Sequence, residues 1–307
     1  MERPMPLPGW TLPGVMACTA ADVLYKSSGL IPDRDVVLTG SGPLLLVFAY
    51  RLLDAGVRIN ALLDTNQHYA LFKALPYLPK ALRGFGYLKK GASMLWKIGH
   101  SGIPFYTGVE SLEALGNPKL KQVRFRKGEN STELPAEMLL LHQGVVPNIQ
   151  ITRQLGCVHR WYGIQIYWEP MVDEWGNTSI TGVTIAGDCG RVSGAAISEY
   201  SGHVAALDTV FKLGAISKED RDHLSQSHRK LLSRHQAVRP FLDRLFQPGK
   251  TWLIPEDEDT LVCRCEEVTV REVRGAVRMG ALSPCLLYTS DAADEGLGVD
   301  LGGRRII

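Results

Sequence analysis

The glycine pair Gly40-x-Gly42 lies between an apolar segment and a helical one, and it constrains the fold of this chain more than any other feature. Residues 35–39 form a short apolar run that predicts a strand, and residues 44–55 have the length and composition of a helix. A second apolar run, residues 58–63, ends at Asp64. Strand, glycine turn, helix and strand in this order predict a βαβ unit, and therefore an α/β fold.

This unit suits a dinucleotide. Glycines let the backbone approach a pyrophosphate at the start of a helix, and Asp64 stands where an acid can bond a ribose hydroxyl. Position 45, where the third glycine of the fingerprint normally stands, is Leu. Two interpretations therefore stay open. Gly40, Gly42 and Asp64 bind NAD(P) or another adenine nucleotide, or the unit is a Rossmann domain whose site is empty or altered.

A second candidate site follows residues 182–186, which predict a strand running into Gly187 and Asp188 ahead of a helix. A carboxylate at the carboxyl end of a strand can accept hydrogen bonds from the sugar-alcohol chain of a flavin. A Gly-Asp pair is also a common turn. The run Gly144-x-x-Pro147-Asn148, earlier in the chain, favours the flavin interpretation and hence FAD.

The six cysteines form one pattern, Cys263-x-Cys265. Two thiolates at this spacing can bind one metal centre, and an iron–sulfur cluster needs four such ligands, so half a site is present. Zinc, a redox pair and coincidence are the alternatives. Cys18, Cys157 and Cys189 are scattered, and we expect them to be packed small residues.

Composition excludes several classes. A formal charge of +2 is too small to indicate nucleic-acid binding, no apolar stretch is long enough to span a bilayer, and the opening residues lack the order of a signal peptide, which predicts a cytoplasmic protein. The eight histidines make no metal-spaced cluster, and we expect His142 and His203 to be structural.

The last residues differ from the rest. Residues 285–295 and 299–307 resemble translated sequencing adaptor, so we expect 285–307 to form no part of the fold and the native sequence to stop near Pro284.

Four segments together resemble one known family. They are Glu2-Arg-Pro-x-Pro-x-Pro-Gly-Trp-Thr-Leu-Pro-Gly-Val15, Gly40-Ser-Gly-Pro-Leu-Leu-Leu46, Ala186-Gly-Asp188 and Cys263-Arg-Cys-Glu-Glu-Val-Thr269. The family is the flavoprotein subunit shared by octopine and nopaline oxidases, hydrogen cyanide synthase and related proline or hydroxyproline dehydrogenases. The resemblance covers nearly all of residues 1–284. It implies a Rossmann-like flavoprotein with two dinucleotide-binding domains, followed by a bacterioferritin-associated-ferredoxin-like [2Fe-2S] domain.

The resemblance also implies roles for particular residues. These are FAD contacts at Gly187 and Asp188, a second nucleotide site at Gly40, Gly42 and Asp64, and [2Fe-2S] ligation by Cys263 and Cys265. The family's FAD pyrophosphate motif precedes the residue matched by Met1, and its other two cysteines fall within the adaptor-like stretch. We therefore expect a chain truncated at both ends, without the N-terminal FAD βαβ unit.

The expected domains follow from this comparison. They are a connector (1–30), an NAD(P)-binding-like Rossmann domain (31–145), the C-terminal part of an FAD domain (146–215), a helical linker (216–258), a truncated [2Fe-2S] domain (259–284) and the adaptor-derived tail (285–307).

The resemblance implies an FAD-dependent oxidoreductase. The expected role is the electron-transfer subunit of a heteromeric amino-acid, opine or amine dehydrogenase or oxidase, which passes electrons through FAD and [2Fe-2S] to an acceptor. Its expected partner is a substrate-oxidising flavoprotein subunit similar to glycine or D-amino-acid oxidase. Two alternatives remain open: a self-contained NAD(P)H-dependent flavoprotein reductase of a ferredoxin-like acceptor, and a non-catalytic structural subunit.

Overall fold

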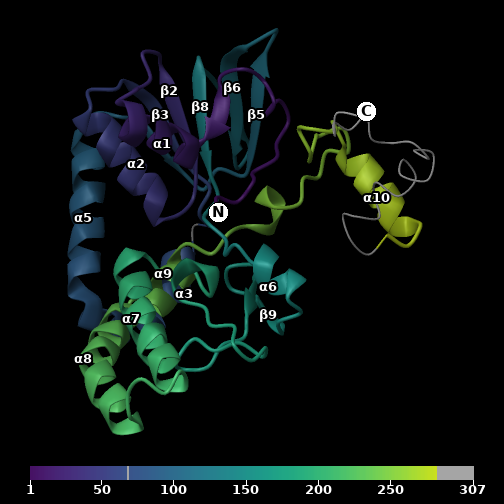
Figure 1. Cartoon of the computed structure of the whole chain (residues 1–307). Coiled ribbons are helices and arrows are strands. Elements are labelled where there is room, and N and C mark those ends of the chain that lie inside the picture. The colour runs from purple at the N-terminus through teal and green to yellow at the C-terminus, as the bar shows by residue number, and fades with distance from the viewer. Residues whose placement is uncertain (68, 282–307) are drawn as a thin grey trace.

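The computed structural model describes residues 1–67 and 69–281 and has an α/β architecture built on a five-stranded parallel sheet (Figure 1). The predicted βαβ unit is confirmed as β2, helix α2 (Pro43–Asp54) and β3. The strands, in their order across the sheet, are β1 (Val15–Ala17), β8 (Met138–His142), β2 (Val36–Gly40), β3 (Ile59–Asp64) and β4 (Phe105–Thr107). The adaptor-like tail lies outside the described residues.

Helices cover one face of this sheet. They are α1 (Cys18–Ser28), α2 and the long α5 (Phe85–His100), and their apolar sides pack on Leu38 and Leu62 of the central strands. Leu45 is only 2% exposed and belongs to this cluster together with Ile98 of α5. A leucine side chain, rather than the third glycine of the fingerprint, therefore forms this part of the α2 packing.

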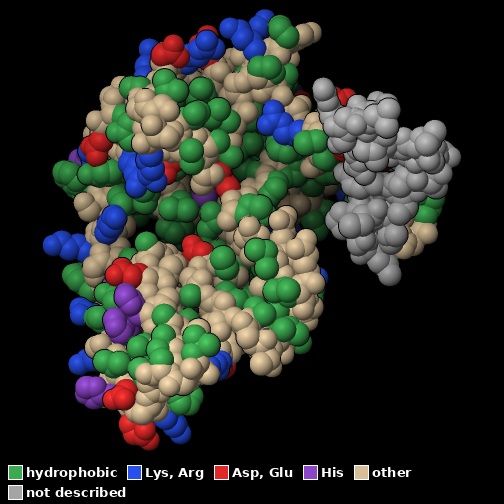
Figure 2. All heavy atoms as spheres, in the orientation of Figure 1, with side chains coloured by type: hydrophobic (Ala, Val, Ile, Leu, Met, Phe, Trp, Pro, Cys, Tyr) green, Lys and Arg blue, Asp and Glu red, His purple; other side chains and the backbone are tan. Residues whose placement is uncertain are grey.

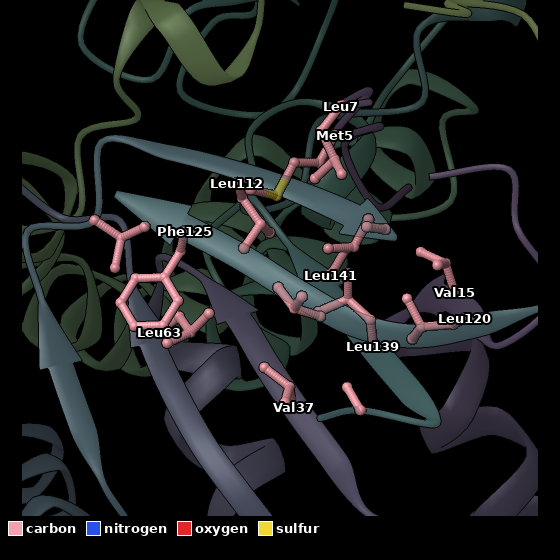
Figure 3. Packing of buried hydrophobic residues seen from close by; sticks show 14 of the residues in the cluster. Met5, Leu7, Val15, Val37, Leu63, Leu112, Leu120, Phe125, Leu139 and Leu141 are labelled. Atoms are coloured by element: carbon pink, nitrogen blue, oxygen red, sulfur yellow. The ribbon is translucent and has the colours of Figure 1, made fainter. Parts of the chain in front are cut away.

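A three-stranded antiparallel sheet covers the other face. Figure 3 shows Leu63 and Leu139 of the parallel sheet pointing toward Leu112 and Phe125 of the second sheet. Because β2 is sandwiched between the two layers, all five of its residues are buried, as expected for a central parallel strand. The antiparallel strands are β5 (Ser111–Gly116), β6 (Leu120–Lys127) and β7 (Asn130–Pro135).

The other half of the molecule is mainly helical and lies below the sheets in Figure 1. Ser217 caps its longest helix, because the Ser217 hydroxyl accepts the Asp220 N–H at 3.0 Å. The elements are α3 (Ala70–Ala74), α4 (Leu78–Ala81), α6 (Gln150–Gln154), β9 (His159–Tyr162), β10 (Tyr167–Pro170), α7 (Ala195–Lys212), α8 (Lys218–Gln236) and α9 (Arg239–Leu245).

The strand expected over residues 182–186 is wrong. In the structure Thr184 forms a single antiparallel bridge with Asn177, and no ladder extends from it. A strand needs a neighbour along its length to satisfy its backbone groups, and within the described part of the chain this segment pairs at that one position. The residues that follow, Gly187–Cys189, form one turn of 3-10 helix (η3).

The last described helix, α10 (Val270–Arg278), stands apart from both halves in Figure 1. It begins with a capping box in which Thr269 and Glu272 exchange hydrogen bonds. The loop before it is held at the N-terminal segment, where the Trp10 indole N–H donates to the Leu261 carbonyl at 2.7 Å. No helix within residues 1–67 and 69–281 is both long and apolar enough to cross a bilayer.

Candidate functional site

The glycine turn lies at the carboxyl edge of the parallel sheet. Gly40 has a φ of 137°, and a Cβ built on it would stand 1.6 Å from the carbonyl oxygen of His142 in the neighbouring strand β8. The Ser41 N–H donates to the same oxygen at 2.9 Å. Gly40 therefore has a structural task, because only glycine lets β2 and β8 meet here. Gly42, with a φ of 127°, is the N-cap of α2 and provides no side-chain cap.

Asp64 ends the adjacent strand and pairs in register with Gly40. Its carboxylate accepts the backbone N–H of Asn66 at 2.9 Å, and the Thr65 N–H donates to the Gly40 carbonyl at 2.9 Å. The structure therefore brings the three residues predicted for the second nucleotide site together at one edge of the sheet. Helix α2 starts beside them at Pro43, and its N-terminus adds the positive end of a helix dipole.

A cavity of about 160 Å³ opens beside this turn, between the sheet and the helical half. In Figure 2 hydrophobic side chains gather in the hollow between these two halves. The apolar walls with a carboxylate at one side resemble the lining of a small-molecule pocket, whereas the volume is smaller than the roughly 300 Å³ at which such pockets usually begin. The cavity is lined by Gly42, Leu45, Leu46, Leu62, Asp64, Asn66, Leu95, Phe105, Leu245 and Phe246.

Sequence reasoning missed the wall contributed by the end of α9. Leu245 and Phe246 lie more than 200 residues from the glycine turn in the sequence. The Asn66 amide fixes this end of α9 by donating to the Leu245 carbonyl at 2.8 Å. No local pattern in the sequence could have indicated them, because their place depends on how the two halves pack.

The second predicted site is the turn at Gly187 and Asp188. Asp188 is exposed, and its Oδ1 accepts the backbone N–H groups of Ser193 at 2.9 Å and Gly194 at 3.3 Å. Gly187 has a φ of 71°, and a Cβ there would stand 2.9 Å from Cβ of Ser198. Glycine at 187 therefore lets the turn lie directly against α7.

Helix α7 starts beside this carboxylate. Its N-cap is Gly194, with a φ of 101° and no side-chain cap, so the first backbone N–H groups of the helix are open to an acceptor. The Gly187 N–H donates to the hydroxyl of Ser201 in α7 at 2.9 Å, which connects the 187–189 turn with the helix. The result is a fixed, exposed carboxylate next to the positive end of a helix dipole.

A cluster of charged side chains lies next to the Asp188 turn, and the sequence did not predict it. Glu169 is 1% exposed and pairs with Arg160 at 2.8 Å and with Arg191 at 3.2 Å. Arg191 follows η3 and lies over the ring of Tyr162, whose hydroxyl donates to Asp243 of α9 at 2.9 Å. Burial, reinforced by the Asp243 carboxylate, raises the pKa of Tyr162. The cluster connects the Asp188 turn with the helix that lines the cavity.

The two paired cysteines lie in the loop before α10. Cys263 is half-buried and Cys265 is exposed, and backbone bonds from Val262 and Cys263 to the Val268 carbonyl close the loop. Across the stretches 1–67 and 69–281, no three metal-binding side chains form a group. The residues present therefore offer two ligands for a cluster that needs four.

The isolated cysteines divide into two kinds. Cys18 and Cys157 are buried, as predicted, and burial together with Glu2 and Asp22 raises the pKa of the Cys18 thiol well above its usual value. The expectation for Cys189 is wrong, because its side chain is exposed beside Asp188. It lies in the η3 turn that packs on α7, on the outer side of that turn.

The two named histidines also differ. His142 is buried and its Nδ1 donates to the Glu2 carboxylate at 2.6 Å, which confirms a structural contact. His203 is exposed and its ring stacks on His228 with centroids 4.4 Å apart.

The parallel sheet, the glycine turn and the acid at the end of the next strand define an α/β protein of the dinucleotide-binding class. The chain belongs to the pyridine nucleotide-disulphide oxidoreductase family, whose profile matches residues 2–202. The family resemblance inferred from the four motifs is confirmed, and the chain belongs to a family of flavin-dependent oxidoreductases.

Curated relatives are named as subunits of oxidases and synthases. An opine oxidase subunit of Agrobacterium tumefaciens (strain Ach5) is 38% identical over 288 residues, which make up 94% of this chain and 57% of that protein. Hydrogen cyanide synthase subunit HcnB of Pseudomonas aeruginosa is 30% identical over 323 residues, covering 100% of this chain and 66% of that protein. The chain therefore spans between about half and two thirds of the length of these relatives.

A solved structure shares the fold. The crystal structure of L-proline dehydrogenase from P. horikoshii superposes with a TM-score of 0.57 at 16% identity, over 94% of this chain and 46% of that one.

Proposed function

We propose that this chain is part of an FAD-dependent electron-transfer subunit of a heteromeric amino-acid, opine or amine dehydrogenase or oxidase. The observation that carries the proposal is the exposed Asp188 carboxylate, fixed by two backbone N–H groups at the open start of α7. The names of the relatives, which are subunits of opine oxidase and of hydrogen cyanide synthase, support a role beside partner subunits.

The residues present fit one part of an FAD site. Ser193 and Gly194 hold one oxygen of Asp188, and the carboxylate remains exposed and able to accept hydrogen bonds from sugar-alcohol hydroxyls. Gly187 lets the turn lie against α7, and the helix dipole favours negative charge at this end. When bound, FAD would supply the redox chemistry, and the Asp188 turn would help to orient it.

The glycine turn and the cavity are proposed as a second nucleotide site. Gly42 and the start of α2 would receive a pyrophosphate, Asp64 a ribose hydroxyl, and the apolar walls an aromatic base. The ligand is NAD(P) or another adenine nucleotide. Asp64 sits at the rim of the apolar cavity, and a carboxylate in this position favours a free 2′-hydroxyl over a 2′-phosphate.

We further propose that Cys263 and Cys265 supply two ligands of a [2Fe-2S] cluster, whose ligand set is incomplete in this chain because the family's other two cysteines would fall in the adaptor-like stretch. The proposed units are a connector (1–30), the nucleotide domain (31–145), part of an FAD domain (146–215), a helical linker (216–258) and the start of the cluster domain (259–284). The proposed partner is a substrate-oxidising flavoprotein subunit, and the proposed location is the cytoplasm.

A second candidate function is a self-contained NAD(P)H-dependent flavoprotein reductase, and the cavity beside Gly42 and Asp64 favours it. In that case a nicotinamide nucleotide, not a partner subunit, delivers the electrons. The two functions differ in what reduces the flavin.

The test of the flavin site is the FAD content of the longer protein that contains this chain, purified together with its partner. Asp188→Ala is expected to lower the FAD-to-protein ratio at least tenfold, since it removes a charged acceptor at the ligand. Asp33→Ala, at an exposed aspartate remote from the turn, serves as the matched control. Full FAD retention by Asp188→Ala at unchanged stability contradicts the proposal.

A further inference from the structure

Buried polar side chains are concentrated at the carboxyl edge of the parallel sheet. Ser41, Thr65, His142 and Gln143 follow or end three neighbouring strands, and each is at most 5% exposed. Thr65 donates to the Gln143 side-chain oxygen at 3.1 Å, but the Gln143 amide nitrogen and the Ser41 hydroxyl have no hydrogen-bond partner among the described residues. Such a layer is costly in a core, and the carboxyl edge of an open α/β sheet is where ligands bind.

Of these four residues, His142 is the ionisable one, and the buried Glu2 carboxylate holds its ring. Its Nδ1 donates to Oε1 of Glu2 at 2.6 Å, and Glu2 is itself 7% exposed at its side chain. The other Glu2 oxygen accepts the backbone N–H of Thr19 at 3.0 Å and also the Thr19 hydroxyl. Glu2 therefore fixes both the orientation of the imidazole and the nitrogen that carries the shared proton.

The free end of the ring faces the glycine turn. A Cβ on Gly42 would stand 3.3 Å from Nε2 and 3.4 Å from Cδ2 of His142, so the ring lies directly against the N-cap of α2. The side-chain hydrogen bond of His142 runs from Nδ1 to Glu2, so the Nε2 side of the ring is turned to Gly42. A nitrogen of a ring that is only 1% exposed thus lies at the place where the turn and the helix start would receive a pyrophosphate.

We infer that His142, oriented by Glu2, is a phosphate-contacting residue of this nucleotide site and adds a side-chain donor to the backbone N–H groups of the glycine turn. The inference rests on the nucleotide site proposed above. Protonated on both nitrogens, the imidazolium donates from Nδ1 to Glu2 and from Nε2 to a phosphate oxygen, and Glu2 balances its charge. His142 is the phosphate-contacting group, and Glu2 is a positioning residue.

The test compares ADP with adenosine, because the two probes share the base and ribose and differ only in the phosphates. Binding of each to the full chain is measured by calorimetry. His142→Ala is expected to weaken ADP binding about tenfold and to leave adenosine binding unchanged, since one charge-assisted hydrogen bond is lost. Glu2→Gln, which keeps the size but replaces one of the two accepting oxygens by an NH2 donor, should weaken ADP binding in the same direction but less. His223→Ala, at an exposed histidine of α8, is the control that alters neither affinity.

One readout needs no variant and remains valid if His142→Ala fails to fold. In the unaltered chain the ¹⁵N resonance of His142 Nε2 is expected to shift when ADP is added and to stay in place with adenosine. Equal loss of both affinities in His142→Ala, or no ¹⁵N shift with bound ADP, identifies a purely structural histidine and overturns the inference alone. A wild-type chain that binds neither probe overturns the nucleotide site itself, and the inference with it.

Discussion

Gly40 and His142 are in direct backbone contact, because any Cβ at position 40 would stand 1.6 Å from the His142 carbonyl oxygen. Gly40→Ala must therefore push strands β2 and β8 apart, and we expect it to lower the free energy of unfolding by about 3 kcal/mol. Urea unfolding followed by circular dichroism measures the effect. A change below about 0.5 kcal/mol, the range typical of surface substitutions, contradicts the account of this turn.

Gly42→Ala is expected to affect ligand binding more than stability, in contrast to Gly40→Ala. Its Cβ would meet only the edge of the His142 ring, at 3.3 Å, so the expected loss of stability is smaller, about 1 kcal/mol from the left-handed backbone. The same methyl group would occupy the approach to the glycine turn. We therefore expect Gly42→Ala to abolish ADP binding while most of the protein stays folded, which calorimetry on the folded variant measures.

The ionised Asp208 is expected to make the stability of the helical half depend on pH. Burial alone would raise its pKa, but hydrogen bonds from Asn177, Lys212 and Arg221 outweigh burial and hold the pKa below 3.8. A lowered folded-state pKa stabilises the fold fully above about pH 4, and this contribution is lost as the pH falls through the folded value. Asp208→Asn should cost about 2 kcal/mol at pH 7 and progressively less toward pH 3.

Unfolding by urea at a series of pH values measures this difference, with the exposed Asp33→Asn as the matched control. A deficit of Asp208→Asn that stays constant down to pH 3 shows that the carboxylate charge contributes nothing.

The cysteines differ in accessibility and therefore in reactivity. Cys189 and Cys265 are exposed, whereas Cys18 is buried and burial raises the pKa of its thiol. Because the thiolate is the reactive form, iodoacetamide at pH 8 should modify the two exposed cysteines first and Cys18 only after unfolding. Peptide mass spectrometry over time measures the order. Modification of Cys18 as fast as Cys265 in the folded protein contradicts the burial.

Trp10 anchors the cysteine loop, because its indole N–H donates to the Leu261 carbonyl and the Arg264 guanidinium lies 5.4 Å over its ring. Trp10→Phe keeps an aromatic ring but removes the donor, at a cost of about 1 kcal/mol. Hydrogen exchange over residues 261–269 should accelerate about fivefold. Trp161→Phe, at an exposed tryptophan of β9, is the control, and an equal effect of both changes contradicts the anchoring role.

The local part of the site follows from the sequence, and the long-range part does not. The spacing of Gly40, Gly42 and Asp64 is set by one βαβ unit, so a single stretch of chain predicted their meeting. The cavity wall from Leu245 and Phe246, and the Glu2 contact to His142 across 140 positions, depend on packing between distant segments. No periodicity or spacing within one sequence encodes such pairs.

The turn at Asp188 shows a second reason why prediction from the sequence fails. The apolar run before it has the composition of a strand, yet Thr184 pairs at one position only, because strand formation depends on a neighbour as well as on propensity. The carboxylate is instead placed by Ser193 and Gly194 at the start of α7. The strand predicted to support Asp188 is therefore wrong, the side chain is exposed, and its contact with FAD stays a prediction.

The central claim is that a partner subunit, and not a nicotinamide nucleotide, reduces the flavin. The most direct measurement mixes the longer FAD-loaded protein with NADH in the absence of oxygen and follows the visible flavin absorbance. It is then repeated with the partner present and with an opine, proline or glycine as substrate. We predict that the absorbance persists with NADH alone and falls once partner and substrate are present. Rapid bleaching by NADH without the partner would contradict the electron-transfer role and establish the reductase instead.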